Sequence, residues 1–558
     1  MTNTLAPVLE VAQLHVGFDG TEVVHGLDLT IMPGECVAIV GESGSGKSVT
    51  ARALLGMAGA DSRTSAKRLR IGGLDLGAAS EREWRRERGR RAGLILQDAL
   101  GSLDPLRTVG REIEDPLRIH LRLPASERRA RVLQLLADVG MPDPASAVRR
   151  RSGELSGGLR QRALIAAAIA LDPPLLIADE PTTALDVTVQ ARILALLDEI
   201  RERGTGVLLI SHDLAVVSRM ADRILVMREG RIIEQGPTGA VLESPREDYT
   251  RSLIAAVPAE VPRGVRLSAS PVRAATPPGA LPTISSAPHP AHDPAIVATP
   301  LLELSHLTKT FTVPGGRFTA VDDVSLSLHR GETLGLVGES GSGKTTLARL
   351  ALALTMPDSG SVSFDGEEWS ALDERRRRPT RHRIGAIYQD PLGSFDPRWN
   401  VGRLLDDAVR GAREAGTNDI SAGPTAPVVA ALLDQVGLAA SVAGRRPLTL
   451  SGGQRQRVAI ARALAGSPEL LICDEPVSAL DVTIQAQILD LLDDIQRQRG
   501  LALLFISHDL GVVHHMADRV AVMQAGRIVE SGDADAVFAR PEHPYTARLV
   551  ADSPRLPR

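Results

Sequence analysis

Short apolar runs alternate along the chain with longer segments of helical periodicity. The runs CVAIV (36–40), LLIAD (175–179) and GVLLIS (206–211) have strand length, whereas QARILALLDEIRER (190–203) repeats apolar residues at helical spacing. Buried strands separated by helices predict a mostly parallel α/β sheet. In such a sheet, the functional loops lie at the carboxyl ends of the strands.

The pattern occurs twice, which predicts a duplicated domain. The offsets between matching segments stay between 292 and 297 residues, and the pairs are ILQDALGSLDP (95–105) with IYQDPLGSFDP (387–397), LSGGLRQR (155–162) with LSGGQRQR (450–457), and LLIADEPTTALDVT (175–188) with LLICDEPVSALDVT (470–483). We therefore expect one domain at 1–257 and a second at 301–558. Residues 258–300 are rich in proline, alanine and serine and lack apolar periodicity, so an extended linker is expected there.

Composition narrows the class of protein. The 558 residues are 43% apolar and 24% charged with a net charge of −4, so no global basic field would attract nucleic acid. Cys36 and Cys473 each fall in an apolar run, which favours buried thiols over a disulfide or a metal site. The N-terminus lacks the pattern of a signal peptide, and no apolar stretch is long enough to span a bilayer. We expect the chain not to cross a membrane by itself.

A glycine-rich octet follows an apolar run in each copy, as GESGSGKS (41–48) and GESGSGKT (338–345). Backbone N–H groups of such a loop and the following helix N-terminus form a cradle for phosphate. Of the 64 basic residues only four are lysines, and Lys47 and Lys344 lie in the octets. The predicted phosphate-binding residues are Gly41, Ser43, Gly44, Ser45, Gly46, Lys47 and Ser48, and Gly338, Ser340, Gly341, Ser342, Gly343, Lys344 and Thr345.

Polar side chains follow three further strands in each copy, and with a phosphate loop upstream they acquire catalytic roles. We expect Mg²⁺ to be held by Ser48 and Thr345 directly and by Asp179 and Asp474 through water. Glu180 and Glu475 are the expected bases that polarise the attacking water. Gln97 and Gln389 are expected to sense the metal and the γ-phosphate, and His212 and His508 to contact the γ-phosphate.

The segment LSGG opens a helix in each copy and adds a second anion-seeking N-terminus to each domain. Each domain then has two phosphate-binding helix N-termini, one after the glycine-rich octet and one after LSGG, but only one nucleotide to bind. A head-to-tail pairing of the two domains resolves this, because the loop of one and the LSGG helix of the other close on the same ATP. The residues concerned are Ser156, Gly157, Gly158, Ser451, Gly452, Gly453 and Gln454.

These ordered motifs resemble the nucleotide-binding domain of ATP-binding cassette (ABC) proteins over both halves of the chain. The resemblance implies two tandem P-loop NTPase domains of the α/β class, each with a mostly parallel sheet and a helical subdomain. It implies ATP and Mg²⁺ as ligands. It also matches Phe18 and Phe311 to the aromatic residue that stacks on adenine, although a core role suits either phenylalanine equally well.

Segments outside the catalytic motifs resemble the ATPases of oligopeptide, dipeptide and nickel importers, including the fused glutathione type. These segments are GSLDP, GSFDPRWNVG and the tails SPREDYTRSL (244–253) and RPEHPYTARL (540–549). The resemblance implies two permease subunits that dock beside Gln97 and Gln389, an extracytoplasmic substrate-binding protein, and a place on the cytoplasmic face of the cell membrane. The cysteine cluster that many members carry at the C-terminus is missing, so an iron–sulfur role is not expected.

The alternative is a tandem ABC protein that acts on ribosomes in translation. That group usually joins its domains by a long charged helix, whereas the expected linker here is broken by proline and nearly uncharged. The arginine-rich runs at 81–91 and 373–383 contain interspersed acids, which favours solvated helix faces over direct nucleic-acid binding. The importer interpretation is therefore preferred.

Overall fold

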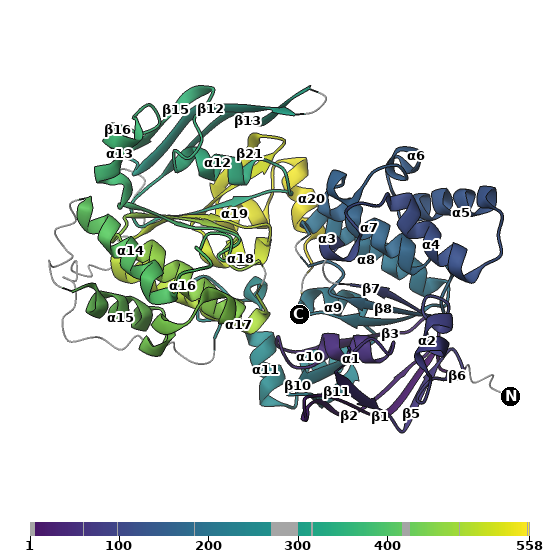
Figure 1. Cartoon of the computed structure of the whole chain (residues 1–558). Helices are drawn as coiled ribbons and strands as arrows, with labels where there is room; N and C mark the ends of the chain where they lie inside the picture. Colours follow the sequence, from purple (N-terminus) through teal and green to yellow (C-terminus); the bar gives the residue numbers. More distant parts are fainter. Residues whose placement is uncertain are drawn as a thin grey trace. The chain divides into compact units, whose positions relative to one another are not determined.

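The computed structural model describes residues 6–59, 61–96, 99–183, 185–268, 299–313, 316–415, 424–478, 480–554 and 556. It divides into two units (Figure 1). The first comprises Met1–Ile254 together with Pro554–Arg558, and the second comprises Ala255–Ser553. The chain thus enters the second unit well before residue 301, where we expected the second domain to begin. Most of the expected linker, residues 269–298, lies outside the described residues.

A six-stranded sheet forms the centre of the described part of the first unit, with strand order β11-β10-β3-β9-β8-β7. All neighbours pair in parallel except β10 and β11, which confirms the expected mostly parallel sheet. The strands are β3 (Cys36–Val40), β7 (Ala92–Ile95), β8 (Leu175–Asp179), β9 (Gly206–Ile210), β10 (Arg223–Arg228) and β11 (Arg231–Pro237). Strands β3, β8 and β9 are buried at every position, as parallel strands covered on both faces must be.

An antiparallel sheet, which the sequence analysis did not predict, accompanies the parallel one. Its strands are β1 (Leu9–Phe18), β2 (Thr21–Ile31), β4 (Ser62–Ser65), β5 (Arg68–Ile71) and β6 (Leu74–Asp75). Strand β1 alternates buried and half-exposed residues over most of its length, a period-two pattern that the sequence does contain. In Figure 1 this sheet and the helices α4, α5 and α7 lie on opposite sides of the parallel strands.

Helices complete the first unit. Helices α4 (Val109–His120), α5 (Ala125–Asp138) and α7 (Gly157–Ala168) contact one another and form the expected helical subdomain. The others are α1 (Lys47–Ala53), α2 (Glu81–Glu87), α3 (Ala99–Ser102), α6 (Pro144–Ala147), α8 (Val187–Glu202), α9 (Leu214–Met220), α10 (Thr238–Glu243) and α11 (Asp248–Ala255).

The second unit repeats this architecture. Its parallel sheet has the order β17-β18-β19-β14-β20-β21, and its antiparallel sheet the order β13-β12-β15-β16. The strands are β12 (Leu302–Val313), β13 (Gly316–Leu328), β14 (Thr333–Val337), β15 (Ser359–Phe364), β16 (Glu367–Glu368), β17 (Ile384–Ile387), β18 (Leu470–Asp474), β19 (Ala502–Ile506), β20 (Arg519–Gln524) and β21 (Arg527–Asp533). The helices are α12 (Lys344–Ala351), α13 (Glu374–Arg381), α14 (Val401–Glu414), α15 (Thr425–Gln435), α16 (Gly452–Leu464), α17 (Val482–Arg499), α18 (Leu510–Met516), α19 (Ala534–Ala539) and α20 (Pro544–Asp552).

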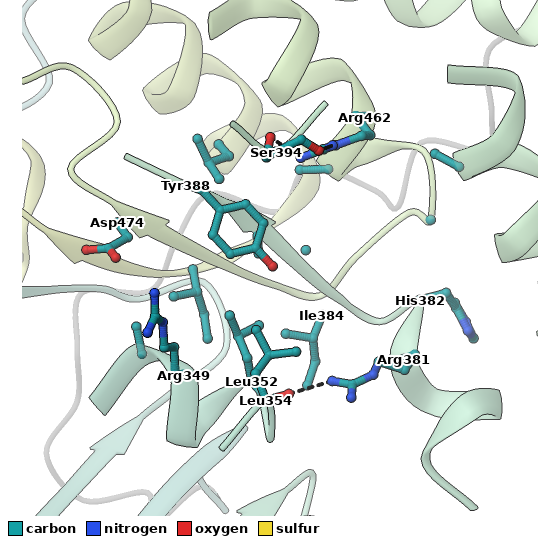
Figure 2. Close-up of a pocket in the computed structure, with 18 of the residues that line it drawn as sticks. Arg349, Leu352, Leu354, Arg381, His382, Ile384, Tyr388, Ser394, Arg462 and Asp474 are labelled. Carbon is teal, nitrogen blue, oxygen red and sulfur yellow. Dashed lines mark hydrogen bonds between the residues drawn. The ribbon is translucent and has the colours of Figure 1, made fainter. Parts of the chain in front are cut away.

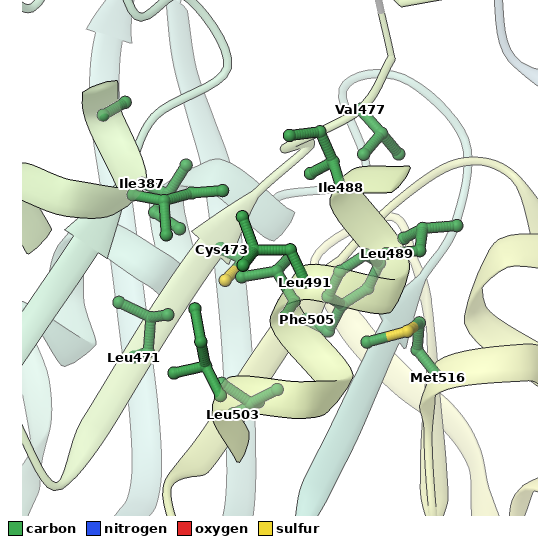
Figure 3. Packing of buried hydrophobic residues seen from close by; sticks show 14 of the residues in the cluster. Ile387, Leu471, Cys473, Val477, Ile488, Leu489, Leu491, Leu503, Phe505 and Met516 are labelled. Atoms are coloured by element: carbon green, nitrogen blue, oxygen red, sulfur yellow. The ribbon is translucent and has the colours of Figure 1, made fainter. Parts of the chain in front are cut away.

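The core of the second unit packs helix α17 against the central strands. Figure 3 shows Cys473 of β18 and Phe505 of β19 beside Ile488 and Leu491 of α17. Cys473 and Phe505 are fully buried, and Cys36 is likewise a buried free thiol in the first unit. The prediction of buried thiols is therefore confirmed. This packing holds the carboxyl ends of β18 and β19 in fixed positions, and the catalytic candidates follow directly from those ends.

Candidate ATP site

The glycine-rich octets connect β3 to α1 and β14 to α12, the strand–loop–helix context that a phosphate loop requires. A side chain on Gly41 would place its Cβ 2.1 Å from the carbonyl oxygen of Met227, and one on Gly338 would lie 2.2 Å from that of Met523. Only glycine allows these loops to lie so close to the neighbouring strand.

Each loop carries a buried lysine. Lys47 Nζ donates hydrogen bonds of 2.7 Å to the carbonyl oxygens of Gly41 and Glu42, so its ammonium lies at the mouth of its own loop. The buried hydroxyl of Ser45 has no hydrogen-bond partner among the residues that the structure describes. A phosphate oxygen would supply that partner and a negative charge for the lysine, so the loop fits a bound phosphate. The second copy repeats these features with Lys344, Gly338, Glu339 and Ser342.

An oxygen pair suited to Mg²⁺ lies beside each loop. Ser48 Oγ donates to Asp179 Oδ1 at 3.0 Å, and Thr345 Oγ1 donates to Asp474 Oδ1 at 3.3 Å. Burial raises the pKa of both aspartates. Mg²⁺ prefers hydroxyl and carboxylate oxygens together with water and substrate phosphates, so the donor set fits the ion. The structure thus brings Ser48 together with Asp179 and Thr345 with Asp474, and their role as metal ligands stays a prediction.

The two candidate bases share an unusual backbone conformation. Glu180 has φ 49° and Glu475 has φ 50°, in the left-handed region that non-glycine residues rarely adopt. Their N–H groups donate to Ile210 O and Ile506 O, at the ends of the neighbouring strands. Positive φ also recurs at other matched positions, such as Asp172 and Ser467, so this conformation supports a functional site only together with the contacts of the glutamates.

A histidine lies against each base. His212 Nδ1 is 3.1 Å from Glu180 Oε1, and His508 Nδ1 is 3.2 Å from Glu475 Oε1. Because Asp474 of β18 pairs in register with Ile506 of β19, the residues after these strands are neighbours. Parallel register thus brings together side chains that are 33 positions apart in the sequence (508 − 475).

Each histidine–glutamate pair favours the charged forms. Burial alone would raise the pKa of Glu475, but the hydrogen bond and charge of His508 outweigh it, so the pKa is lowered. Burial alone would lower the pKa of His508, but the hydrogen bond and charge of Glu475 raise it overall. The pKa values of Glu180 and His212 shift in the same directions for the same reasons. An ionised glutamate is the form that a general base needs.

The two bases differ in their remaining contacts. Gln389 Nε2 donates to Glu475 Oε2 at 2.8 Å, so this glutamine lies next to the base. It also lines the same cleft as Thr345 and Asp474. Gln97, the proposed counterpart, lies outside the described residues. In the first copy Thr183 Oγ1 donates to Glu180 Oε2 at 3.0 Å.

The LSGG segments begin helices as expected. Ser156 caps α7 by accepting the N–H of Leu159, and Ser451 caps α16 by accepting that of Gln454. A hydroxyl that accepts at a cap still has its own hydrogen to donate to a phosphate. Gln454 Oε1 also accepts the N–H of Ser451 at 3.3 Å and closes a capping box, which a leucine at 159 cannot do.

The two candidate adenine-stacking residues have different surroundings. Phe18 is half-buried and packs against the core of the first unit. Phe311 is 39% exposed, with Lys309 Nζ 5.7 Å from its ring centroid. Stacking on adenine stays a prediction for both.

Two tyrosines of the tail segments, to which the sequence assigned no role, contact the phosphate loops. The N–H of Glu42 donates to Tyr249 Oη, and the N–H of Glu339 donates to Tyr545 Oη, each at 3.0 Å. They are two of only three tyrosines in the chain. The helices that carry them, α11 and α20, thus hold the loop in both units.

Comparisons with known proteins agree with this geometry. The family model described as ABC transporter matches residues 24–183 and 321–478. The model described as the C-terminal region of oligopeptide/dipeptide transporters matches 233–279 and 529–558, where the two tyrosines lie. The chain belongs to the ABC transporter family. It is an ABC transporter ATPase that binds ATP, with two ATP-binding domains in one polypeptide.

Relatives match this ABC ATPase over nearly its full length. A glutathione import ATP-binding protein of Salmonella choleraesuis is 42% identical over 98% of this chain and 89% of its own. An oligopeptide transport ATP-binding protein of Mycobacterium bovis is 41% identical over 99% of both chains. A solved structure of an archaeal ribosome recycling factor in complex with a ribosomal stalk protein matches 91% of this chain and 88% of its own, with a TM-score of 0.57 and 20% identity. That last likeness concerns the fold alone.

Within the described residues, no helix of this ABC ATPase has the length and apolarity needed to cross a membrane.

Replacing Tyr545 by phenylalanine should weaken ATP binding at the second loop. The N–H of Glu339 would lose its acceptor, a change worth about 1 kcal/mol, or about fivefold in Kd. Equilibrium titration with a fluorescent ATP analogue measures the effect at each site. Tyr249→Phe is the matched variant and should weaken the first site instead. Equal Kd values in Tyr545→Phe and the parent would contradict the assigned role.

Replacing Leu159 by glutamine should leave ATP turnover within a few-fold of the parent, because the proposed phosphate contacts use the serine hydroxyl and backbone N–H groups. The new side chain should close the missing capping box and raise the free energy of unfolding by about 0.5–1 kcal/mol. Steady-state ATPase assays and denaturant unfolding measure the two effects. Gln454→Leu should lose a similar amount of stability, and a tenfold rise of turnover in Leu159→Gln would show that the side chain at 159 contacts the nucleotide.

Proposed function

We propose that this protein is the ATP-hydrolysing subunit of an importer, and that it drives uptake of peptides or related small solutes through partner permeases. The observation that carries the proposal is the intact glutamate–histidine pair beside a phosphate loop in both copies. The oligopeptide/dipeptide C-terminal regions and the relatives named for peptide and glutathione transport support the class of cargo.

The two ATP sites are composite in this proposal, and the two halves of the chain pair head to tail. Each domain has a phosphate loop and a serine-capped helix N-terminus, and both ends attract the phosphates of one nucleotide. The first site combines Lys47, Asp179, Glu180 and His212 with Ser451 and Gly453. The second combines Lys344, Asp474, Glu475 and His508 with Ser156 and Gly158.

Hydrolysis at each site follows from the groups present. The carboxylate of Glu475 accepts a proton from water as the water oxygen attacks the γ-phosphorus, and the bond to the bridging oxygen breaks to leave ADP and inorganic phosphate. His508 has Nδ1 engaged with Glu475, which leaves Nε2 to donate to the γ-phosphate as charge develops. Gln389 holds the other oxygen of Glu475 and orients the base.

Mg²⁺, when bound, would neutralise charge on the β- and γ-phosphates. The residues that would hold it are Ser48 and Asp179 in the first site and Thr345 and Asp474 in the second. Gln389 lines the same cleft as Thr345 and Asp474 and would contribute to the metal site of the second copy, and the same role is proposed for Gln97 in the first.

A cleft in the second unit is suited to a permease helix. It has a volume of about 1210 Å³ and extends from Asp474 and Gln389 to helix α14. Figure 2 shows Tyr388 and Leu354 at this cleft, and their side chains are 37% and 53% exposed. The lining combines apolar side chains with charged ones such as Arg349 and Arg381, so the concavity next to Gln389 would receive an amphipathic helix and transmit its movement to the base. We propose that two permease subunits dock here and at the equivalent surface of the first unit.

This docking would place the protein on the cytoplasmic face of the cell membrane, with a substrate-binding protein on the opposite side. Those partners would select the cargo from the candidate classes of peptide, glutathione and nickel. A role on the ribosome is not favoured, since the likeness to the recycling factor is 20% identical, against 42% for the glutathione relative.

Substituting either base tests the proposal. Glu180→Gln or Glu475→Gln should slow hydrolysis at its own site by about 10²–10⁴-fold, the usual range for loss of a general base, and should stop transport. The measurements are ATPase activity and solute uptake by vesicles that contain the protein with its permeases.

Each variant is the matched control for the other, because the contact between glutamate and histidine is the same in both copies. If Glu475→Gln kept full ATPase activity and uptake while Glu180→Gln abolished both, the second site would be regulatory. The claim of two hydrolysing sites would then be wrong.

A further inference from the structure

Residues 256–268, here called the strap, belong structurally to the second unit although they follow the last helix of the first domain. Ala256 and Leu267 are 3% and 2% exposed and form part of the core cluster of the second unit, and Val261 packs against the same cluster. A segment whose apolar residues are buried in this way is a part of the fold rather than a free connection.

A buried carboxylate on α17 binds the end of the strap. Asp490 is 4% exposed and accepts the N–H groups of Leu267 and Ser268 at 2.9 Å each, and the hydroxyl of Ser268 at 2.5 Å. Within the part of the chain that the structure describes, all the hydrogen bonds recorded for Asp490 come from the strap. Without the strap, a carboxylate would be left in a buried position with these partners missing, which is strongly unfavourable.

Helix α18 holds the middle of the strap. His515 Nδ1 donates to the carbonyl oxygen of Val261 at 3.0 Å. Gly511 lies under Ala259, and a Cβ at position 511 would be 2.8 Å from that of Ala259. Glycine weakens a helix relative to alanine. We attribute the glycine at position 511 to the close approach of the strap, which leaves no room for a side chain.

Two ion pairs add to the contacts between the strap and the rest of the second unit. Arg263 pairs with Asp518, directly before β20, and Arg266 pairs with Asp494 of α17. The strap therefore crosses α17 and α18 and binds to both.

The first copy of the domain lacks three of the residues that contact the strap. The two copies align through DVT (186–188 and 481–483) and SHDL (211–214 and 507–510). In this register Asp490 corresponds to Ala195, Gly511 to Ala215 and His515 to Arg219. The residues next to these positions are largely the same in both copies. Three of the positions at which the two copies differ are therefore ones that accept from, accommodate or donate to the strap.

We propose that the strap binds residues of α17 and α18 that the first domain does not carry, and that the tail of the first domain thereby positions the helix behind His508. Helix α18 begins two residues after this histidine (510 − 508), and α17 follows the loop next to Glu475. Strap binding then supports the second ATP site but not the first. The part of the inference that concerns His508 rests on the proposed function, whereas the binding itself does not.

Hydrogen exchange of the full chain without nucleotide tests the binding. The variants are Asp490→Ala and Gly511→Ala, which introduce the residues of the first copy, and Leu267→Ala on the strap itself. Each should speed exchange in peptides covering 261–268 at least tenfold. Glu199→Ala, at the counterpart of Asp494 on α8, is the matched control and should leave these peptides unchanged. Exchange in the parent as fast as in an unstructured peptide, or no change in any variant, would overturn the proposal.

Site-resolved turnover tests the positioning. In a Glu180→Gln background only the second site hydrolyses, and the strap variants should lower that turnover several-fold. In a Glu475→Gln background, which reports the first site, they should have no effect. A general loss of folding would lower turnover at both sites and would also lower the melting temperature of the variant. Faster exchange with unchanged second-site turnover would overturn the positioning role. If neither background hydrolysed ATP, the proposed function would fail while the exchange result would still decide the binding.

Discussion

The contact between a glutamate and a histidine at the ends of two adjacent parallel strands is the interaction on which each ATP site depends. Glu475 follows β18 and His508 follows β19, and the pairing of these strands leaves the two side chains 3.2 Å apart. The histidine keeps the glutamate ionised in a buried position, where desolvation alone would favour the neutral acid. The base is therefore available because the sheet is parallel and buried.

Other features of the fold hold this pair in relation to the phosphate loop. The metal candidates end the same strand as the base, and the loop begins at β14, which pairs with β19. Tyr545 ties the loop to α20, and the strap ties α17 and α18 to the end of the first domain. Elements far apart in the sequence thus converge on the carboxyl ends of three neighbouring strands.

Much of this arrangement could be predicted from the sequence because it depends on local patterns. The octets, the strand-ending carboxylates and the serine-capped helices each combine an apolar run with a few polar residues at fixed spacing, and parallel sheets place strand ends together. The antiparallel sheet was not predicted although β1 alternates, because the continuous apolar runs of the buried strands are a stronger signal than the alternation of a half-buried strand. The tyrosine contacts and the strap could not be predicted, since each links residues more than 200 positions apart. Proline and arginine in the strap resembled a linker, and only the partners Asp490 and Gly511 show otherwise.

The most direct test of two complete sites in one chain is the number of ATP molecules bound when hydrolysis is blocked at both. The chain carrying Glu180→Gln and Glu475→Gln together should retain two ATP molecules per polypeptide with Mg²⁺, measured by equilibrium dialysis with labelled nucleotide. Placing a bulky residue at one LSGG serine, as in Ser451→Arg, should abolish ATP retention at the site of Lys47 and leave retention at the site of Lys344 unchanged. Retention of a single ATP by the double variant, or loss at the site of Lys344 on changing Ser451, would contradict the account.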